Sequence, residues 1–325
     1  MNVLITGAGS VMGQSIFKAL DHHDFGRRLN VHFANSDTLG AGRYFTGQRS
    51  DVVATPLFPL ARDPQYDAVL DDYVRQNGID IVYAGTQHEL AKICEWRERT
   101  GRAATLTSSI ADICLDKVKT AEVLGRHGVR VPRTQPLDQY LAAPSIEGPV
   151  IVKPNASSAS RNIRRFENHE ACLAAMSSGA PASLSMLVQE TLLGSEYTVG
   201  CYVDRYGQGL STICFRRTLT PDGATFHGEI VAEPAIEAYV RSVGAALVRE
   251  GMEFGHVNVQ LIVDPLGPCL FEINGRLSST EAPKAHFGFN SCAAYATNIV
   301  LGRPYTALRP ASSGQFLRYY DEVYF

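Results

Sequence analysis

The sequence predicts an α/β unit followed by an α+β unit. In roughly the first 110 residues, apolar runs alternate with amphipathic stretches, the pattern of a parallel sheet covered by helices on both faces. From Gly148 onward, strand-like runs follow one another with fewer helices between them. The chain has 325 residues, which at about 150 residues per domain corresponds to roughly two domains.

Composition and charge indicate a globular protein without a general affinity for polyanions. Hydrophobic residues make up 45% of the chain and charged residues 19%, ordinary values for a protein with a large core. The 30 basic and 33 acidic residues give a net charge of −3, so neither nucleic acid nor a membrane is an expected partner. Any phosphate binding must therefore be local.

Cysteine spacing and apolar runs indicate the cellular compartment. The seven cysteines never form a C-x-x-C pair, which predicts neither a disulfide framework nor a zinc ribbon. The N-terminus shows no secretory leader, and no run of about 18 apolar residues occurs. We therefore expect a soluble, cytoplasmic protein.

The first unit opens with a strand, a glycine turn and a helix. An apolar run at 3–6 leads into GAGSVMG, and residues 15–20 have helical character. The next elements are a strand at 31–34, a helix at 66–74 that ends at Asn77-Gly78, and a buried strand at 79–84. This order predicts a Rossmann-like domain.

The second unit has the texture of an α+β fold. A helix at 111–128 ends before Pro132 and is followed by the strand PVIVKP at 149–154. The later elements are a helix at 168–176, strands at 187–190 and 196–203, a helix at 235–249, and a hairpin of HVNVQLIVD and CLFEIN.

Three glycines of the opening turn allow two interpretations. Gly7, Gly9 and Gly13 follow a strand and open a helix, where backbone N–H groups can approach a phosphate. Asp37 ends the second strand, where a dinucleotide-binding protein places a ribose-binding acid. The spacing G-x-G-x-x-x-G departs from the strict fingerprint, and glycines needed only for tight strand-to-helix packing are the alternative.

Two lysines are candidates for phosphate binding. Lys153 ends an apolar strand beside the small-residue loop at 155–160, an arrangement that suits a lid over phosphates. An ordinary surface lysine is the alternative, but the combination with Lys117 and the downstream acids favours phosphate contact.

Candidates for binding a nucleoside follow the lysines. Glu190 and Glu196 bracket the turn TLLGS, whose peptide around Leu192 can hydrogen-bond an adenine edge while a carboxylate binds ribose hydroxyls. Two solvated acids are the alternative. His227, in TFHGE, carries no signal of its own.

The segment FEINGR carries the strongest local signal. Residues two apart in a strand share a face, so Glu272 and Asn274 project together and Arg276 continues in the same direction. A carboxylate within an apolar run is costly unless it is paired or bound to a metal, and oxygen ligands suit Mg²⁺. An exposed hairpin face is the alternative.

Gln260 joins this set if the hairpin has the right register. A three-residue loop at 265–267 pairs Asp264 with Pro268, and hence Gln260 with Glu272. A four-residue loop would move Gln260 to the other face.

Together these motifs resemble the ATP-grasp enzymes, most closely the synthetase units of the carbamoyl phosphate synthetase large subunit and the related carboxylate-amine ligases. The resemblance covers nearly the whole chain. After the glycine turn it comprises DKVKT at 116–120, IVKP at 151–154, VQETLLGSEYTV at 188–199, NVQ at 258–260 and EINGR at 272–276. It implies a Rossmann-like pre-ATP-grasp domain at 1–112, an ATP-grasp lid subdomain at 113–186, and a C-terminal subdomain with the metal and phosphate site at 187–325.

The resemblance also implies a role for each candidate residue. The glycine domain would help to form the acceptor pocket, which reverses the dinucleotide interpretation. Arg276 would stabilise the phosphoryl group in transfer. The other implied contacts are ATP phosphates for Lys117 and Lys153, adenine for Glu190 and Leu192, ribose for Glu196, proximity to the nucleotide for His227, and Mg²⁺ or Mn²⁺ for Gln260, Glu272 and Asn274.

Two positions depart from the family pattern. The lid loop NASSASRN carries serines and alanines where the family is commonly glycine-rich, which makes its backbone less permissive. Gly275 replaces the usual proline and loosens the backbone that aims Arg276. Both departures keep every charged group, so we still expect activity.

The expected function is an ATP-dependent ligase that joins a small-molecule carboxylate to an amine through an acyl phosphate and assembles, as one option, into a homodimer. A thiol or ammonia acceptor is also compatible. Thr86, Gln87, Glu89 and Arg161 are candidates for the acceptor pocket. The rivals are an NAD(P)-dependent oxidoreductase and a catalytically silent ATP-binding protein.

Overall fold

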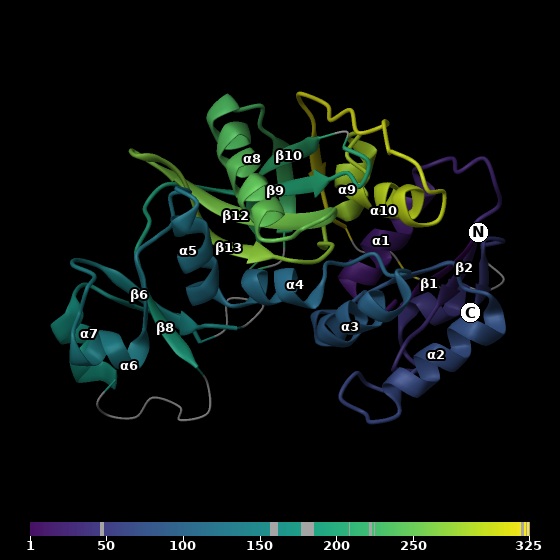
Figure 1. Ribbon diagram of the computed structural model, residues 1–325, viewed down its shortest axis with the longest axis horizontal. Helices are drawn as coiled ribbons and strands as arrows, with labels where there is room; N and C mark the ends of the chain where they lie inside the picture. The colour runs from purple at the N-terminus through teal and green to yellow at the C-terminus, as the bar shows by residue number, and fades with distance from the viewer. Residues whose placement is uncertain are drawn as a thin grey trace.

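Three β-sheets organise the protein. The computed structural model describes residues 1–45, 49–156, 162–176, 185–207, 209–220, 223, 225–319, 322 and 324. A parallel sheet lies at one end of the molecule, a small sheet at the other, and a large antiparallel sheet between them and to one side (Figure 1). The mixed α/β and α+β architecture predicted from the sequence is confirmed.

The N-terminal unit is built on a four-stranded sheet in the order β3-β2-β1-β4. Every strand pair in it is parallel. Val3 and Ile5 face α1 on one side, whereas Leu4 faces α2 and α3 on the other, so helices cover both faces as predicted. The elements of this unit are β1 (Asn2–Ile5), α1 (Val11–Asp21), β2 (Asn30–Phe33), η1 (Ala41–Phe45), β3 (Val52–Ala54), α2 (Tyr66–Asn77), β4 (Ile81–Tyr83), η2 (Gln87–Glu89) and α3 (Leu90–Thr100).

The glycine turn after β1 is filled by the protein's own groups. A Cβ on Gly13 would lie 2.6 Å from the carbonyl oxygen of Gly7. The N–H of Gly9 donates to Asn35 Oδ1 at 2.6 Å, and Asp37 is exposed and accepts from the N–H of Leu39. These contacts favour tight strand-to-helix packing over dinucleotide binding as the reason for the glycines.

The prediction of a single helix at 111–128 is wrong, because the chain forms two helices in this region. They are α4 (Ser108–Leu115) and α5 (Lys117–Arg126), separated by Asp116 in an extended conformation. The carboxylate of Asp116 accepts from the N–H of Lys119 at 2.8 Å and caps the second helix. This break makes Lys117 the first residue of α5.

A small sheet with its own core forms the lid, a name used here for residues 134–190. Its strand order is β5-β8-β6-β7. Val150, Val152 and Val188 of the sheet pack with Tyr140 and Cys172 of its helices. The elements are β5 (Thr134–Pro136), α6 (Leu137–Ala142), β6 (Val150–Pro154), β7 (Arg164–Phe166), α7 (His169–Met176) and β8 (Met186–Glu190). The expected division at 186/187 falls inside β8, which pairs with β6 and therefore belongs to the lid sheet.

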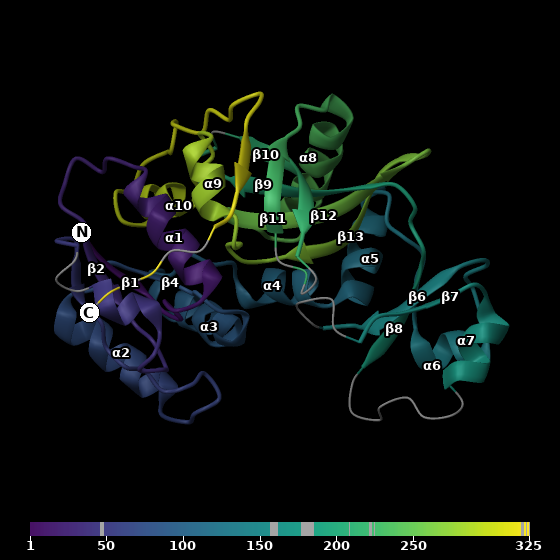
Figure 2. The ribbon, with the colours of Figure 1, turned by 180° about the vertical axis from the view of Figure 1, so that it is seen from behind.

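The central sheet is six-stranded and antiparallel, in the order β13-β12-β9-β10-β11-β14. Helix α8 covers one face, and α9 and α10 lie on the side of α1 (Figures 1 and 2). Phe215 of the sheet, Tyr295 of α10 and Phe17 of α1 share one core, which joins the central sheet to the N-terminal unit. The elements are β9 (Ser195–Val203), β10 (Leu210–Leu219), β11 (Thr225–Ile230), α8 (Pro234–Arg249), β12 (Gly255–Asp264), β13 (Gly267–Asn274), α9 (Glu281–His286), α10 (Ser291–Ile299) and β14 (Gln315–Leu317).

The β12–β13 hairpin has the predicted register at the site, although its turn differs from the prediction. Asp264 pairs with Gly267 rather than with Pro268, so the connection is one residue shorter than expected. A bulge beyond Gln260 restores the alignment, and Gln260 lies opposite Glu272 as predicted.

Two further sequence expectations concern helices and cysteines. In the described ranges, no helix has both the length and the apolar character needed to span a bilayer. All seven cysteines are free thiols and buried.

The close approach of the first and last parallel strands generates a stability prediction. A Cβ on Gly85 would lie 1.9 Å from the carbonyl oxygen of Thr6, so Gly85→Ala must displace backbone. We expect it to lower the free energy of unfolding by more than about 2 kcal/mol in urea denaturation followed by circular dichroism. Gly125→Ala is the control, because its Cβ would meet only Val131 Cγ2 at 3.8 Å, in the last turn of α5. It should be neutral or stabilising by up to about 1 kcal/mol, and equal effects of the two changes would contradict the prediction.

Candidate functional site

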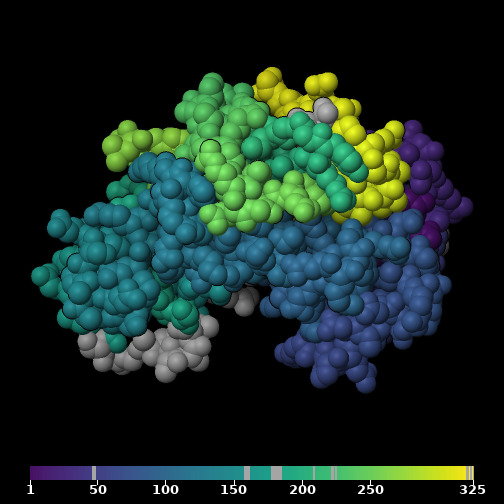
Figure 3. Space-filling view, in the orientation of Figure 1, coloured from purple at the N-terminus to yellow at the C-terminus, as the bar shows by residue number. Residues whose placement is uncertain are grey.

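A single large cleft collects residues from the N-terminal unit, the lid and the central sheet. Its volume is about 870 Å³, and the surface is hollowed between the lid and the N-terminal unit (Figure 3). Nine of the predicted site residues line it: Lys117, Lys153, Glu190, Leu192, Glu196, Gln260, Glu272, Asn274 and Arg276.

Lys153 is a buried cation at the end of β6. Its Nζ donates to Gln189 Oε1 at 2.8 Å and to the carbonyl oxygen of Phe271 at 3.3 Å. Burial and, to a lesser extent, the charge of Lys117 lower its pKa to about 8, against the opposing effect of the Glu272 charge. The ammonium is thus held by uncharged oxygens of the lid and of the central sheet.

Lys117 approaches the same wall of the cleft from the first turn of α5. Its Nζ donates to the carbonyl oxygen of Asn155 at 3.1 Å, and the neighbouring N–H of Val118 donates to Asn155 Oδ1 at 3.1 Å. Two buried ammonium groups, of which Lys117 lowers the pKa of Lys153, suit a polyanion such as a phosphate chain.

The residues predicted to hold a metal form an oxygen-rich set. Gln260 and Glu272 lie opposite each other on β12 and β13, and Asn274 follows two residues later on the same strand. One carboxylate and two amide oxygens suit Mg²⁺, which takes few protein ligands and leaves positions for phosphate oxygens. Among the residues that the structure describes, no group of three or more His, Cys, Asp or Glu side chains offers another metal site.

Arg217 is a site residue that the sequence did not reveal. It lies on β10, its side chain is 10% exposed, and it forms an ion pair with Glu196. Its Nη2 also donates to Gln260 Oε1 at 3.0 Å. One guanidinium therefore connects Glu196, the predicted ribose-binding acid, to Gln260, a predicted metal ligand. Its hydrogen bond leaves the Gln260 oxygen less available to a metal ion.

The predicted adenine segment is anchored to the strand beside it. Both carboxylate oxygens of Glu190 accept from Arg133, one from its N–H at 3.0 Å and one from Nε at 2.8 Å. Leu192 and Leu193 line the cleft immediately beyond. The Glu190 side chain is thus engaged by Arg133, the residue before the lid, and the segment presents its backbone and apolar side chains to the cleft.

Arg276 connects the end of β13 with the N-terminal unit. Its Nε donates to Gln87 Oε1, and its Nη1 donates to the carbonyl oxygen of Leu277 at 3.1 Å and lies 3.4 Å from Met12 Sδ. Burial lowers its pKa, against the charges of Glu272 and Glu281. The glycine before it packs tightly, since a Cβ on Gly275 would lie 3.0 Å from Cys114 Cβ. Close packing against α4 thus constrains the backbone that the sequence suggested would be loose.

The four candidates for the acceptor pocket have different outcomes. Thr86 and Gln87 line the cleft as expected. Glu89 is instead buried inside the N-terminal unit, where it accepts from Thr6, Tyr66 and Thr86. Arg161 and most of the loop NASSASRN lie outside the described residues.

The structure does not bring His227 to the cleft. Thr225, at the start of β11, is a lining residue, but His227 is not among the described residues that form the wall. Its Nε2 lies 3.4 Å from Gln315 Oε1 on β14, the edge strand of the central sheet.

Comparisons with known sequences identify one domain family. A family model described as the ATP-grasp domain matches residues 114–280. A D-alanine--D-alanine ligase from Ectopseudomonas mendocina (strain ymp) is 33% identical over 91 residues, which are 27% of this chain and 29% of that ligase. The chain therefore matches less than a third of this curated relative's length.

Solved structures resemble nearly the whole chain. An L-amino acid ligase from Bacillus licheniformis superposes with a TM-score of 0.71 at 16% identity over 95% of this chain and 77% of that one. An N5-carboxyaminoimidazole ribonucleotide synthetase from Thermus thermophilus superposes with a TM-score of 0.72 at 13% identity, over 98% of this chain and 82% of that one. The biotin carboxylase domain of the Hydrogenobacter thermophilus 2-oxoglutarate carboxylase superposes with a TM-score of 0.73 at 15% identity, over 97% of this chain and 73% of that one. At these identities the likeness is one of fold.

The lowered pKa of Lys153 predicts a pH dependence of nucleotide binding. The ammonium attracts phosphates only while it is protonated, so affinity for MgATP should be full below pH 7 and fall as the pH rises through about 8. We expect calorimetric titration to show about a tenfold weaker affinity at pH 9 than at pH 7. Lys153→Met should bind more weakly at pH 7 and lose this dependence.

Asp37→Asn is the matched control for this titration, because Asp37 is exposed and outside the cleft. It should bind MgATP as the unmodified protein does at every pH. A wild-type affinity that is constant from pH 7 to 9, or a larger loss in Asp37→Asn than in Lys153→Met, would contradict the assignment.

Proposed function

Because the chain belongs to the ATP-grasp family, we propose that it is an ATP-dependent ligase that joins a small carboxylate to an amine and releases ADP and phosphate. One observation carries the proposal: Lys117, Lys153, Glu272 and Arg276 line one cleft, although they come from three separate segments of the chain. The likeness to an L-amino acid ligase and to a D-alanine--D-alanine ligase supports a reaction of this class.

In this proposal the two lysines hold the phosphate chain. Lys153, whose acceptors are the uncharged oxygens of Gln189 and Phe271, gains a charged partner when a phosphate arrives. Lys117 approaches from α5 at the base of the lid loop. Gln260, Glu272 and Asn274 would hold Mg²⁺, which when bound neutralises charge on the phosphates.

The nucleoside would lie between the lid and the central sheet. Glu196, fixed by its ion pair with Arg217, would accept from ribose hydroxyls, and the backbone around Leu192 would bind the adenine edge. His227 receives no role, because it is not among the described residues of the cleft.

Arg276 would stand where the substrate carboxylate meets the γ-phosphate. The carboxylate oxygen attacks phosphorus, the bond to the bridging oxygen breaks, and ADP leaves with that electron pair. The amine then adds to the carbonyl carbon and loses a proton, and phosphate departs with the original carboxylate oxygen. A fixed guanidinium stabilises the charge of the transferring group, and Gln87 holds it in place. The acceptor side would be formed with Ser10 and Thr86 of the N-terminal unit.

The remaining parts of the expectation are also proposals. They are small-molecule partners only, a cytoplasmic location, a homodimer as the assembly to test, and three units divided near residues 112 and 186, with β8 assigned to the lid because it pairs with β6.

A catalytically silent ATP-binding protein is the second candidate function. Its support is the serine- and alanine-rich sequence NASSASRN in place of a glycine-rich lid loop. The oxidoreductase alternative loses its support with the packed glycine turn and the exposed Asp37.

Trapping by hydroxylamine tests the ligase proposal. The protein is incubated with MgATP, hydroxylamine and single amino acids or small carboxylates. An acyl phosphate would yield a hydroxamate, with ADP and phosphate in equal amounts. Formation of AMP and pyrophosphate would show adenylation instead, a stable phosphorylated product would show a kinase, and binding of MgATP without any product would support the silent protein.

Glu272→Gln tests the acid of the proposed metal set. The change removes a ligand charge but keeps size and hydrogen bonding, so we expect Mg²⁺-dependent ADP release to fall by about 100-fold or more with an unchanged melting temperature. Glu237→Gln is the control, since Glu237 pairs with Arg241 on the exposed face of α8 and should remain fully active. A fully active Glu272→Gln would remove this acid from the metal site.

A further inference from the structure

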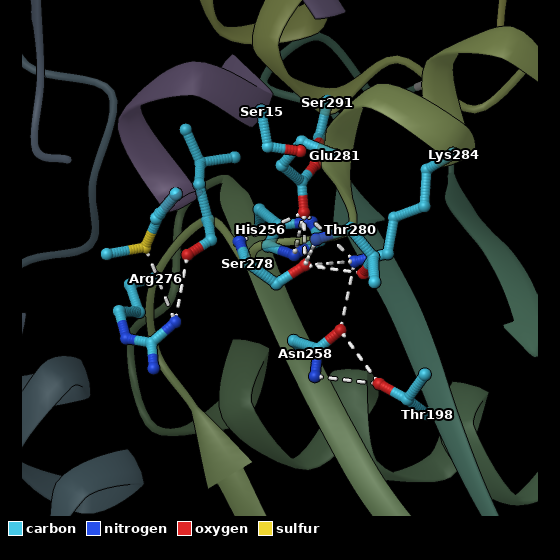
Figure 4. A network of polar contacts seen from close by, with 12 residues as sticks. Ser15, Thr198, His256, Asn258, Arg276, Ser278, Thr280, Glu281, Lys284 and Ser291 are labelled. Atoms are coloured by element: carbon cyan, nitrogen blue, oxygen red, sulfur yellow. Dashed lines mark hydrogen bonds and ion pairs between the residues drawn. The ribbon is translucent and has the colours of Figure 1, made fainter. Parts of the chain in front are cut away.

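A buried ionic cluster lies directly behind the reacting end of the cleft. Lys284 and Glu281 of α9 and His256 of β12 are at most 1% exposed. Figure 4 shows them between the central sheet and α1, next to Asn258 and Ser278, both of which line the cleft. Burying charges here is costly unless every group finds a partner, so the contacts of each charge show what the cluster holds.

All three protons of the Lys284 ammonium have acceptors. Nζ donates to Asn258 Oδ1, Ser278 Oγ and Glu281 Oε1, each at 2.9 Å. Asn258 and Ser278 both line the cleft, whereas Lys284 does not. The ammonium therefore reaches the cleft only through these two side chains.

Through Asn258, the ammonium acts on the metal side of the cleft. Asn258 lies opposite Asn274 in the hairpin and two residues before Gln260. Its Nδ2 donates to Thr198 Oγ1 at 3.0 Å, while its Oδ1 accepts from Lys284. With both ends of the amide engaged, the side chain has one orientation beside the proposed metal ligands.

Through Ser278 and Glu281, the same charge orders the segment that follows Arg276. Glu281 Oε1 accepts from the N–H of Ser278 at 3.0 Å and from its hydroxyl at 2.8 Å. Burial alone would raise the pKa of Glu281, but His256, Lys284 and Ser291 lower it to about 2, so the carboxylate stays charged. The segment 276–281 is thus held by hydrogen bonds to the ion pair of Lys284 and Glu281.

The neighbouring strand leaves room for the lysine. A Cβ on Gly200 of β9 would lie 3.1 Å from Lys284 Cε and 3.2 Å from Nζ. The sheet therefore has room for the Lys284 side chain because position 200 of β9 carries no side chain.

We infer that Lys284 is a positioning residue: its ammonium sets the orientation of Asn258 and the course of residues 276–280, and through them the reacting end of the cleft. The inference rests on the proposed ligase function. A buried ion pair adds little net stability over apolar residues of similar size, whereas it does fix the geometry of the polar groups around it.

A pair of substitutions separates positioning from stability. Lys284→Met leaves the Glu281 carboxylate buried and unpaired, so its melting temperature should fall. Lys284→Met/Glu281→Gln removes both charges and should recover most of that loss. If Lys284 were merely structural, activity would recover together with the melting temperature.

We expect activity to stay low in the double variant. With MgATP, hydroxylamine and the carboxylate found by the screen, kcat for ADP release should be about 30-fold below wild type, and KM for MgATP should change less than about threefold. The matched control is Arg130→Met/Asp264→Asn, which removes another ion pair of β12 outside the cleft and should keep wild-type kcat. A folded double variant with wild-type kcat would overturn the inference.

Gly200→Ala offers an independent test that keeps both charges. Its Cβ would lie 3.0 Å from Phe289 Cε1 and 3.1 Å from Lys284 Cε, so the phenyl ring and the lysine must shift by a few tenths of an ångström. We expect kcat to fall while the ion pair remains. This variant decides the matter if the double variant does not fold, and wild-type kcat in folded Gly200→Ala would contradict positioning.

Hydrogen exchange provides a readout that needs no turnover. Amides of residues 276–281 should exchange about tenfold faster in the Lys284→Met/Glu281→Gln protein, and at the wild-type rate in the Arg130→Met/Asp264→Asn control. If the wild-type protein releases no ADP with any acceptor, the proposed function fails and exchange alone decides the inference. Unchanged exchange in this segment of the folded double variant would overturn it.

Discussion

The buried ammonium of Lys153 is the constraint on which the cleft depends. A cation taken out of water is costly, and the acceptors of this one within the described part of the chain are the uncharged oxygens of Gln189 and Phe271. Lys117 adds a second buried charge of the same sign and makes the first less favourable. The protein tolerates this arrangement if an anion with several charges binds between the lysines, and the oxygen ligands at Gln260, Glu272 and Asn274 suit the cation that accompanies such an anion.

The packing of the cores explains how the three sheets hold these groups. The N-terminal unit and the central sheet share one core through α1, α9 and α10, and Tyr83 donates to the carbonyl oxygen of Cys292 at 2.7 Å across it. Arg276, held by Gln87, lies where those two parts meet. The lid has a separate small core and brings Lys153 to the cleft on β6. In our proposal, the Lys153 ammonium and the Arg276 guanidinium therefore reach the reacting phosphate from two separately packed parts of the protein.

Local sequence patterns were sufficient to predict the positions of residues in the β12–β13 hairpin, whose two strands follow each other in the chain. The period of two in FEINGR placed Glu272 and Asn274 on one face, and both line the cleft. The pairing of Gln260 with Glu272 was predicted correctly from a wrong turn, because a shorter connection and a bulge compensate for each other. The helix predicted at 111–128 failed at Asp116, whose capping contact outweighed the helical periodicity.

Contacts between distant segments could not be predicted in this way. Arg217 meets Glu196 only because β10 lies beside β9, with Arg216 opposite Tyr197, and strand order is not written in either segment. Lys284 likewise reaches Asn258 from a helix 26 residues away in the chain. His227 was assigned by resemblance alone, and the edge strand β14 shows where it lies instead.

Isotope tracing tests the central claim most directly, namely that the cleft transfers the γ-phosphoryl group of ATP to a carboxylate. The carboxylate substrate is labelled with ¹⁸O in both oxygens, and the released phosphate is analysed by mass spectrometry after one turnover with MgATP and the amine. Our account predicts one labelled oxygen in the phosphate and none in the nucleotide, because the attacking oxygen leaves with phosphorus. Unlabelled phosphate, or label in AMP, would contradict it.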